Sequence, residues 1–151
     1  MPLRLNSPIP DFSGATEWIN GTTKMSDLEG TPVLVHFWSS SCHICHENMP
    51  VMMEWRKDFG KKGLKFLAFH TPRQESDLDV ETVREKIAEY KITESCGIDN
   101  NRAVLDSFQS EFLSAYFLFD REGLLRRRAA GHAGVTLLLP EIEQLLQEKP
   151  V

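Results

Sequence analysis

The chain of 151 residues has only three cysteines and no long apolar run. Small secreted domains that rely on disulfides for stability are rich in cysteine, so the sequence excludes that class. No apolar stretch reaches the roughly 20 residues of a membrane-spanning helix, and residues 1–6 lack the apolar core of a signal peptide. We therefore expect a cytoplasmic protein without membrane insertion, with one domain over residues 1–151, unless a longer natural chain carries an export signal.

The sequence also lacks an excess of positive charge. Its 17 Lys and Arg residues are outnumbered by 22 Asp and Glu residues, which gives a formal net charge of -5. Nucleic acids and anionic membranes attract basic surfaces, so we expect no nucleic-acid partner. The one basic run, Arg126 to Arg128, falls in a predicted strand, where side chains alternate between faces, and is interpreted as a solvated edge strand.

What the chain does contain is an alternation of predicted strands and helices. Residues 33–38 form an almost uninterrupted apolar run, typical of a strand buried on both faces, and residues 64–69 form a second. Apolar residues recur at helical spacing over 42–60 and 80–90. This order predicts an α/β fold with a central mixed β-sheet flanked by helices.

An added β-hairpin is predicted near the N-terminus. Asn20 and Gly21 are the pair that best tolerates the positive φ angles of a two-residue hairpin turn. The flanking segments 16–19 and 22–25 contain β-branched and aromatic residues. We therefore expect these two segments to pair with each other.

The C-terminal third predicts a second hairpin and a closing helix. Segments 116–119 and 124–127 are separated by a short connection that contains Gly123, so they should be antiparallel neighbours. An amphipathic pattern over 138–146 predicts the helix. Pro140 is tolerable there only if it lies in the first helical turn.

The feature that carries chemistry is the pair Cys42 and Cys45, which lies where a buried strand gives way to a helix. Disulfide exchange needs one exposed, acidic thiol that attacks and a second thiol that resolves the mixed disulfide. At the start of a helix, unpaired N–H groups and the helix dipole would lower the pKa of Cys42. Cys45, one turn later, would point inward.

Three polar neighbours are candidates for supporting this pair. An imidazolium at His43 or His46 would stabilise the thiolate and raise the reduction potential of the couple. Glu47, in the first turn of the predicted helix, can either shuttle protons or act as a carboxylate that favours the helix dipole.

The sequence resembles the TlpA/ResA-like branch of the thioredoxin superfamily, which is related to AhpC/TSA. The resemblance rests on F-W-S-S-S-C-H-I-C over residues 37–45, followed by Glu47 and Pro50. Residues 9–12 (I-P-D-F) and 116–123 (Y-F-L-F-D-R-E-G) resemble the opening and the late strand and turn of that family. The match spans nearly the whole chain.

This resemblance implies a thioredoxin-like fold and thiol-disulfide oxidoreductase activity, in which Cys42 is the nucleophile, Cys45 resolves and Trp38 packs beneath the site. The implied partners are protein thiols and disulfides. No cofactor is implied beyond the redox-active disulfide itself, and we expect a monomer.

Three positions depart from the family pattern. Ser41 stands where Trp usually precedes the first cysteine, which removes an aromatic surface beside the dithiol. His36 stands where relatives keep Asp or Asn, and it is either a proton relay for Cys45 or a hydrogen-bonded core residue. Ser114 aligns with the family's cis-proline, so the peptide before it should be trans, because a non-proline cis bond costs about 2.5–4 kcal/mol.

A metal site is the main alternative. Two thiolates with an imidazole from His43, His46 or His132 would suffice for zinc or copper(I). Cys96 could be a further ligand, although its place in a predicted strand favours a buried, inert thiol.

Two other chemistries are open. A thiol peroxidase would use one cysteine to attack peroxide, but the chain lacks the P-x-x-x-T-x-x-C signature of peroxiredoxins. Residues 42–46 also match the C-x-x-C-H signature of c-type haem attachment, which normally requires export and a large apolar pocket.

Overall fold

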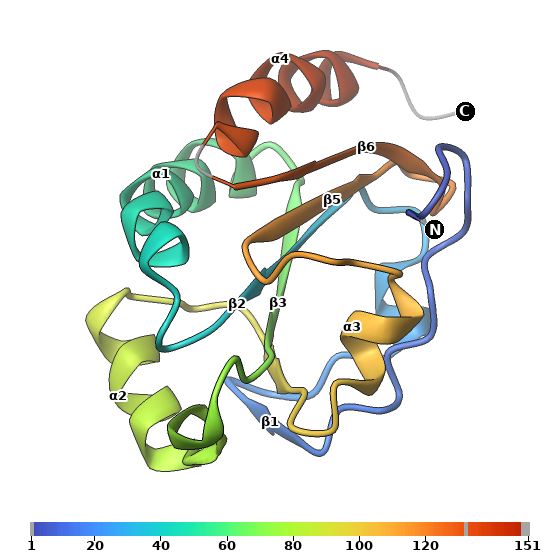
Figure 1. Cartoon of the computed structure of the whole chain (residues 1–151). Helices are drawn as coiled ribbons and strands as arrows, with labels where there is room; N and C mark the ends of the chain where they lie inside the picture. The colour runs from blue at the N-terminus through green and yellow to red at the C-terminus, as the bar shows by residue number, and fades with distance from the viewer. Residues whose placement is uncertain (1, 132, 149–151) are drawn as a thin grey trace.

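A computed structural model describes residues 2–131 and 133–148 (Figure 1). In these residues the strands form one mixed sheet in the order β1-β4-β3-β2-β5-β6. The central strand β2 is parallel to β3 and antiparallel to β5. The strands are β1 (Glu17–Ile19), β2 (Val33–Trp38), β3 (Lys65–His70), β4 (Cys96–Ile98), β5 (Ala115–Phe119) and β6 (Leu125–Ala130). The predicted α/β fold class, a central mixed sheet flanked by helices, is confirmed.

Helices cover both faces of the sheet. They are α1 (His43–Gly60), α2 (Val80–Glu89), α3 (Ala103–Ser107) and α4 (Gly134–Gln147), with single 3-10 turns η1 (Met25–Leu28) and η2 (Glu75–Leu78). Residues of α1, α2 and α4 pack on one face, whereas α3 and the N-terminal segment pack on the other. The described helices include none that is long and apolar enough to cross a membrane.

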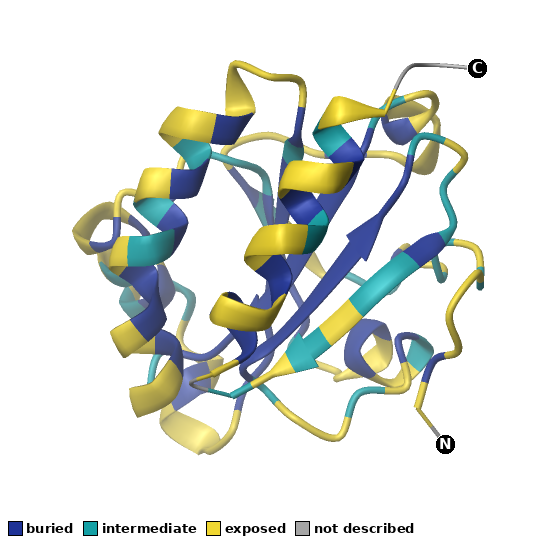
Figure 2. Ribbon diagram, turned by 90° about the horizontal axis from the view of Figure 1, so that it is seen from above, coloured by how far each residue is buried: buried dark blue, intermediate teal, exposed yellow. Residues whose placement is uncertain are grey.

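The burial pattern follows from this layering. All six residues of β2 are buried, because helices lie over both of its faces. The helices bury one side and expose the other, and Figure 2 shows buried strands beneath helices whose outer sides are exposed. An apolar run without alternation was the sequence signal for the central strand, and the structure confirms it.

The N-terminal strand is present, but the predicted hairpin is wrong. β1 pairs antiparallel with β4, with Trp18 opposite Gly97, and residues 22–25 form no strand. Asn20 has the predicted positive φ of 66°, yet its side-chain amide donates to the carbonyls of Ile92 and Glu94. An isolated two-stranded hairpin is only marginally stable, whereas pairing with β4 extends a six-stranded sheet.

The closing helix also starts earlier than predicted. α4 begins at Gly134, so Pro140 lies well inside it and not in its first turn. Pro140 removes one hydrogen bond, to the carbonyl of Thr136, at about 3 kcal/mol. Burial of Leu138 and Ile142, both 0% exposed, offsets this loss, since a fully buried Leu or Ile contributes about 1.5–3 kcal/mol.

Candidate active site

The two cysteines lie just beyond the carboxyl end of β2, where α1 begins. Cys42 is the N-cap residue of α1 and forms a disulfide with Cys45, with their Cα atoms 5.3 Å apart. The backbone N–H of Cys45 donates to Cys42 Sγ at 3.2 Å. Cys42 is 9% exposed and Cys45 only 2%, so Cys42 is the more accessible residue of the pair. The predicted placement at the helix start is confirmed.

Trp38 supports the dithiol from beneath. Its side chain is fully buried and belongs to the same apolar cluster as Cys42 and Cys45. Its ring packs edge-on against His70, with centroids 4.8 Å apart, and against Tyr90 at 6.0 Å. Because this packing fixes the last residue of β2, it also fixes the start of the loop, residues 39–41, that leads to Cys42.

A carboxylate that the sequence analysis did not single out holds that loop. Asp77, buried in η2, accepts hydrogen bonds from the hydroxyls of Ser39, Ser40 and Ser41 at 2.6–2.9 Å. It also accepts from the backbone N–H of Arg73 at 2.9 Å. Burial opposes its ionisation, but these hydrogen bonds outweigh burial and lower the pKa of Asp77 to about 2.

His70 holds the same loop from the end of β3. Its Nε2 accepts a hydrogen bond from the backbone N–H of Ser40 at 3.0 Å, which places the ring proton on Nδ1. Burial lowers the pKa of His70 to about 4, so the ring is neutral near pH 7. Since β2 and β3 are parallel, their carboxyl ends meet at one edge of the sheet. That the carboxyl ends of parallel strands meet was the sequence signal that could have identified His70 and Asp77 as neighbours of the dithiol.

The polar neighbours of the dithiol point elsewhere in this oxidised form. The His43 side chain is 83% exposed, and its Nε2 lies 2.8 Å from Glu47 Oε1, one helical turn away. His46 makes a short hydrogen bond through Nδ1 with the Tyr90 hydroxyl. The contacts described for both rings are therefore with groups other than the sulfurs, and their role in tuning the thiol stays a prediction.

His36 lies in a buried charged network under α1. Its Nε2 is 2.7 Å from Glu94 Oε2, and Arg56 Nε is 2.5 Å from Glu94 Oε1. Burial opposes ionisation of Glu94, but His36 and Arg56 lower its pKa to about 2. This is the hydrogen-bonded core arrangement that was one of the two interpretations of His36, and a relay role stays a prediction.

Ser114 is buried at the entrance of β5 and lies beside the dithiol, in a hollow that Cys42 also lines. The residues described contain no cis peptide bond, so the peptide before Ser114 is trans as predicted. The preceding carbonyl, of Leu113, lies 3.8 Å from Cys45 Sγ. The position that aligns with the family's proline is therefore occupied by a serine in the wall of the site.

A groove of about 390 Å³ opens next to Cys42. One part of its wall is basic and another is apolar. The groove is lined by Cys42, His43, Ile44, Arg73, Arg102, Glu111, Phe112, Leu113, Ser114 and Gly131. Sequence reasoning singled out neither arginine, because each lies in a separate loop.

Of the residues proposed as metal ligands, the structure brings together Cys42 and Cys45, which are joined in a disulfide. Over 2–131 and 133–148 there is no group of three or more His, Cys, Asp or Glu side chains that could hold a metal ion. His132 lies outside the described residues. Cys96 is buried, and burial raises the pKa of its thiol to about 12.

The sequence profile of the AhpC/TSA family matches residues 5–128. The chain belongs to the AhpC/TSA family. Thiol-disulfide oxidoreductase YkuV of Bacillus subtilis (strain 168) is 38% identical over 147 residues, which cover 97% of this chain and 99% of that protein. Thiol-disulfide oxidoreductase ResA of Geobacillus kaustophilus is 29% identical and covers 95% of this chain, with 76% of its own length matched.

Solved structures confirm the thioredoxin-like fold. A thioredoxin-like protein whose solution structure was determined in the oxidised form has a TM-score of 0.88 and 38% identity, covering 95% of this chain and 97% of its own. A thiol-disulfide isomerase from Corynebacterium glutamicum shares the fold, with a TM-score of 0.79, 19% identity and 97% of each chain covered. With the Cys42–Cys45 disulfide in place, this AhpC/TSA protein is a thiol-disulfide oxidoreductase of thioredoxin-like fold.

Proposed function

We propose that Cys42 is the nucleophile and Cys45 the resolving thiol in disulfide exchange with protein partners. The observation that carries this assignment is the asymmetry of the pair. Cys42 caps α1 and lines an open groove, whereas Cys45 is 2% exposed and lies behind it. N–H groups at the helix start favour the thiolate of Cys42.

In the reducing direction, the Cys42 thiolate attacks one sulfur of a partner disulfide. The partner S–S bond breaks, a Cys42–partner S–S bond forms, and the other partner sulfur leaves as a thiolate that takes a proton. The Cys45 thiolate then attacks Cys42 Sγ and releases the second partner sulfur. The partner gains two electrons and two protons, and the dithiol becomes the Cys42–Cys45 disulfide. The oxidising direction is the reverse.

The surroundings of Cys42 keep its geometry fixed through this cycle. Asp77 and His70 hold residues 39–41, so the sulfur is presented without reordering the loop. The buried network of His36, Glu94 and Arg56 lies between the sheet and α1, and anchors the helix that carries both cysteines. The cytoplasmic compartment and the monomeric state stay predictions.

Trapping tests the assignment. Cys45→Ser leaves Cys42 able to attack but unable to be released, so mixed disulfides should accumulate with protein partners and disappear on adding dithiothreitol. Cys42→Ser is the matched control and should trap none through residue 45, which is buried. If Cys45→Ser forms no mixed disulfide with a reducible protein substrate while its Cys42 still reacts with iodoacetamide, the proposed exchange is wrong.

A further inference from the structure

The groove beside Cys42 has a local charge opposite to that of the whole chain. The formal net charge of the chain is -5, yet Arg73 and Arg102 both line this groove. Glu111 is the one carboxylate in the lining. A small basic surface on an acidic protein attracts carboxylates at short range only, because charges separated by more than about 10 Å are screened at 0.1 M salt.

Both guanidinium groups are held in place by backbone carbonyls and not by carboxylates. Arg73 Nη1 donates to the carbonyl of Ser41, the residue before Cys42, at 2.8 Å. Arg102 Nη1 donates to the carbonyl of Pro72, the residue before Arg73, at 2.5 Å. In the described part of the chain neither arginine has an ion-pair partner. Two charges are thus fixed close to the nucleophile with their remaining N–H groups free to donate.

Arg102 occupies an unusual backbone conformation. Its φ of 61° lies in the left-handed region, where non-glycine residues other than Asn and Asp are uncommon. It is held there by its own N–H, which donates to the carbonyl of Asp99 at 2.9 Å. Arg102, and not a small residue, is therefore the N-cap residue of α3, and it lines the groove.

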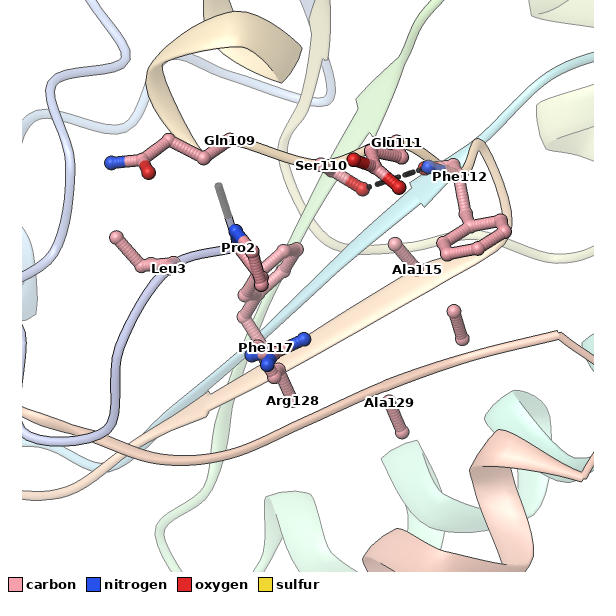
Figure 3. Close-up of a pocket in the computed structure, with 11 residues that line it drawn as sticks. Pro2, Leu3, Gln109, Ser110, Glu111, Phe112, Ala115, Phe117, Arg128 and Ala129 are labelled. Carbon is pink, nitrogen blue, oxygen red and sulfur yellow. Dashed lines mark hydrogen bonds between the residues drawn. The ribbon is translucent and has the colours of Figure 1, made fainter.

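Two apolar residues of the groove lining are exposed to solvent. Phe112 is 60% exposed and Ile44 40%, although both are large apolar residues. Phe112 and Glu111 also line a neighbouring hollow of about 240 Å³. Figure 3 shows this hollow, with Phe112 in the loop that precedes β5. Phe112 therefore forms a ridge between the two hollows. Aromatic residues, Phe included, are enriched in protein interfaces relative to the rest of the surface.

Partner segments reach Cys42 through this groove, and we infer that Arg73 and Arg102 in its wall select segments with an Asp or Glu next to the reacting cysteine. The inference rests on the proposed disulfide exchange and adds its substrate class. The partner's sulfur would meet Cys42, its apolar neighbours would lie on Ile44 and Phe112, and a flanking carboxylate would accept hydrogen bonds from the guanidinium groups.

The test uses the reduced protein and three synthetic peptides. Each peptide has one cysteine joined by a disulfide to 2-thiopyridine, and the residue before the cysteine is Asp, Asn or Lys. The Cys42 thiolate attacks the peptide sulfur, the S–S bond to 2-thiopyridine breaks, and 2-thiopyridone leaves and is followed by its absorbance. The readout is the ratio of rates for the Asp and Asn peptides, which cancels general changes in reactivity.

We expect a ratio of about five at low ionic strength, from two partly exposed charge pairs. It should fall towards one in about 0.5 M salt, and the Lys peptide should react more slowly than the Asn peptide. Arg102→Gln should lower the ratio to about two, whereas Arg102→Lys should largely restore it. Arg84→Gln removes the same charge from α2, outside the groove lining, and should keep the wild-type ratio.

Equal rates for the Asp and Asn peptides, or a ratio that Arg102→Gln leaves unchanged, would overturn the inference while leaving the exchange reaction standing. Release of 2-thiopyridone from none of the three peptides would instead refute the proposed function, and this inference with it.

Discussion

The Ser41 hydroxyl donates a 2.6 Å hydrogen bond to the Asp77 carboxylate, and Ser41 is the residue before Cys42. The two residues are 36 positions apart, so the contact ties the loop after β3 to the loop that presents the nucleophile. Ser39 and Ser40 donate to the same carboxylate. A single ionised side chain therefore binds the hydroxyls of all three residues between β2 and Cys42.

Removing the charge of Asp77 should destabilise the protein. Asp77→Asn keeps the shape but loses charge-assisted hydrogen bonds, each of which is worth about 1.5–3 kcal/mol. We expect the free energy of unfolding to fall by about 2 kcal/mol at pH 7, measured by urea denaturation. The pKa of Asp77 is lowered to about 2 in the folded state, so its contribution is complete above its unfolded value of 3.8.

The difference between wild type and Asp77→Asn should therefore shrink as pH falls from about 4 to 2. Asp58→Asn, an exposed substitution on α1, is the matched control and should change stability by less than about 0.5 kcal/mol. A difference that stays constant down to pH 2 would show that the Asp77 carboxylate is not the group responsible.

His70 should make the protein less stable in mild acid. Its folded pKa is lowered from 6.5 to about 4, so between these values the unfolded chain binds a proton that the folded chain does not. Stability is therefore lost as pH falls from 6.5 to 4, by up to roughly 3 kcal/mol. His70→Gln, whose amide oxygen can accept from Ser40 N–H, should flatten this part of the profile. An unchanged slope would contradict a buried neutral His70.

Breaking the buried network under α1 should be costly. Glu94→Gln leaves the charge of Arg56 buried without its partner, and such losses amount to about 3–5 kcal/mol. We expect a decrease of about 3 kcal/mol in the free energy of unfolding. Glu89→Gln removes an exposed ion pair with Lys86 and should change stability by less than about 1 kcal/mol. Similar effects for the two variants would show that burial does not strengthen the Glu94 network.

Cys96 should be inert in the folded protein. It is the one free cysteine of the oxidised form, it is buried, and burial raises its pKa to about 12. Native oxidised protein should therefore incorporate no iodoacetamide at pH 8, and the same protein in guanidinium chloride should incorporate one equivalent, measured by mass spectrometry. Rapid labelling of the native protein at Cys96 would contradict this burial.

The sequence by itself determined the features that depend on neighbouring residues. The apolar run over 33–38, the loop of serines and the spacing of Cys42 and Cys45 predict a strand, a turn and a helix start, and the structure has all three. These features are local because the pleat of a strand and the caps of a helix involve residues only a few positions apart. The resemblance to a known family added the thioredoxin-like fold.

Only the tertiary structure decided which distant segments meet. β1 pairs with β4 and not with the residues after Asn20. A strand that joins a larger sheet is more stable than a strand in an isolated two-stranded hairpin. His36 meets Glu94, 58 positions away, and Arg73 meets Ser41, 32 positions away. Such contacts follow from the order of strands in the sheet, which no local pattern encodes. The dithiol could be identified from the sequence, whereas the groove beside it is formed by segments that only the fold brings together.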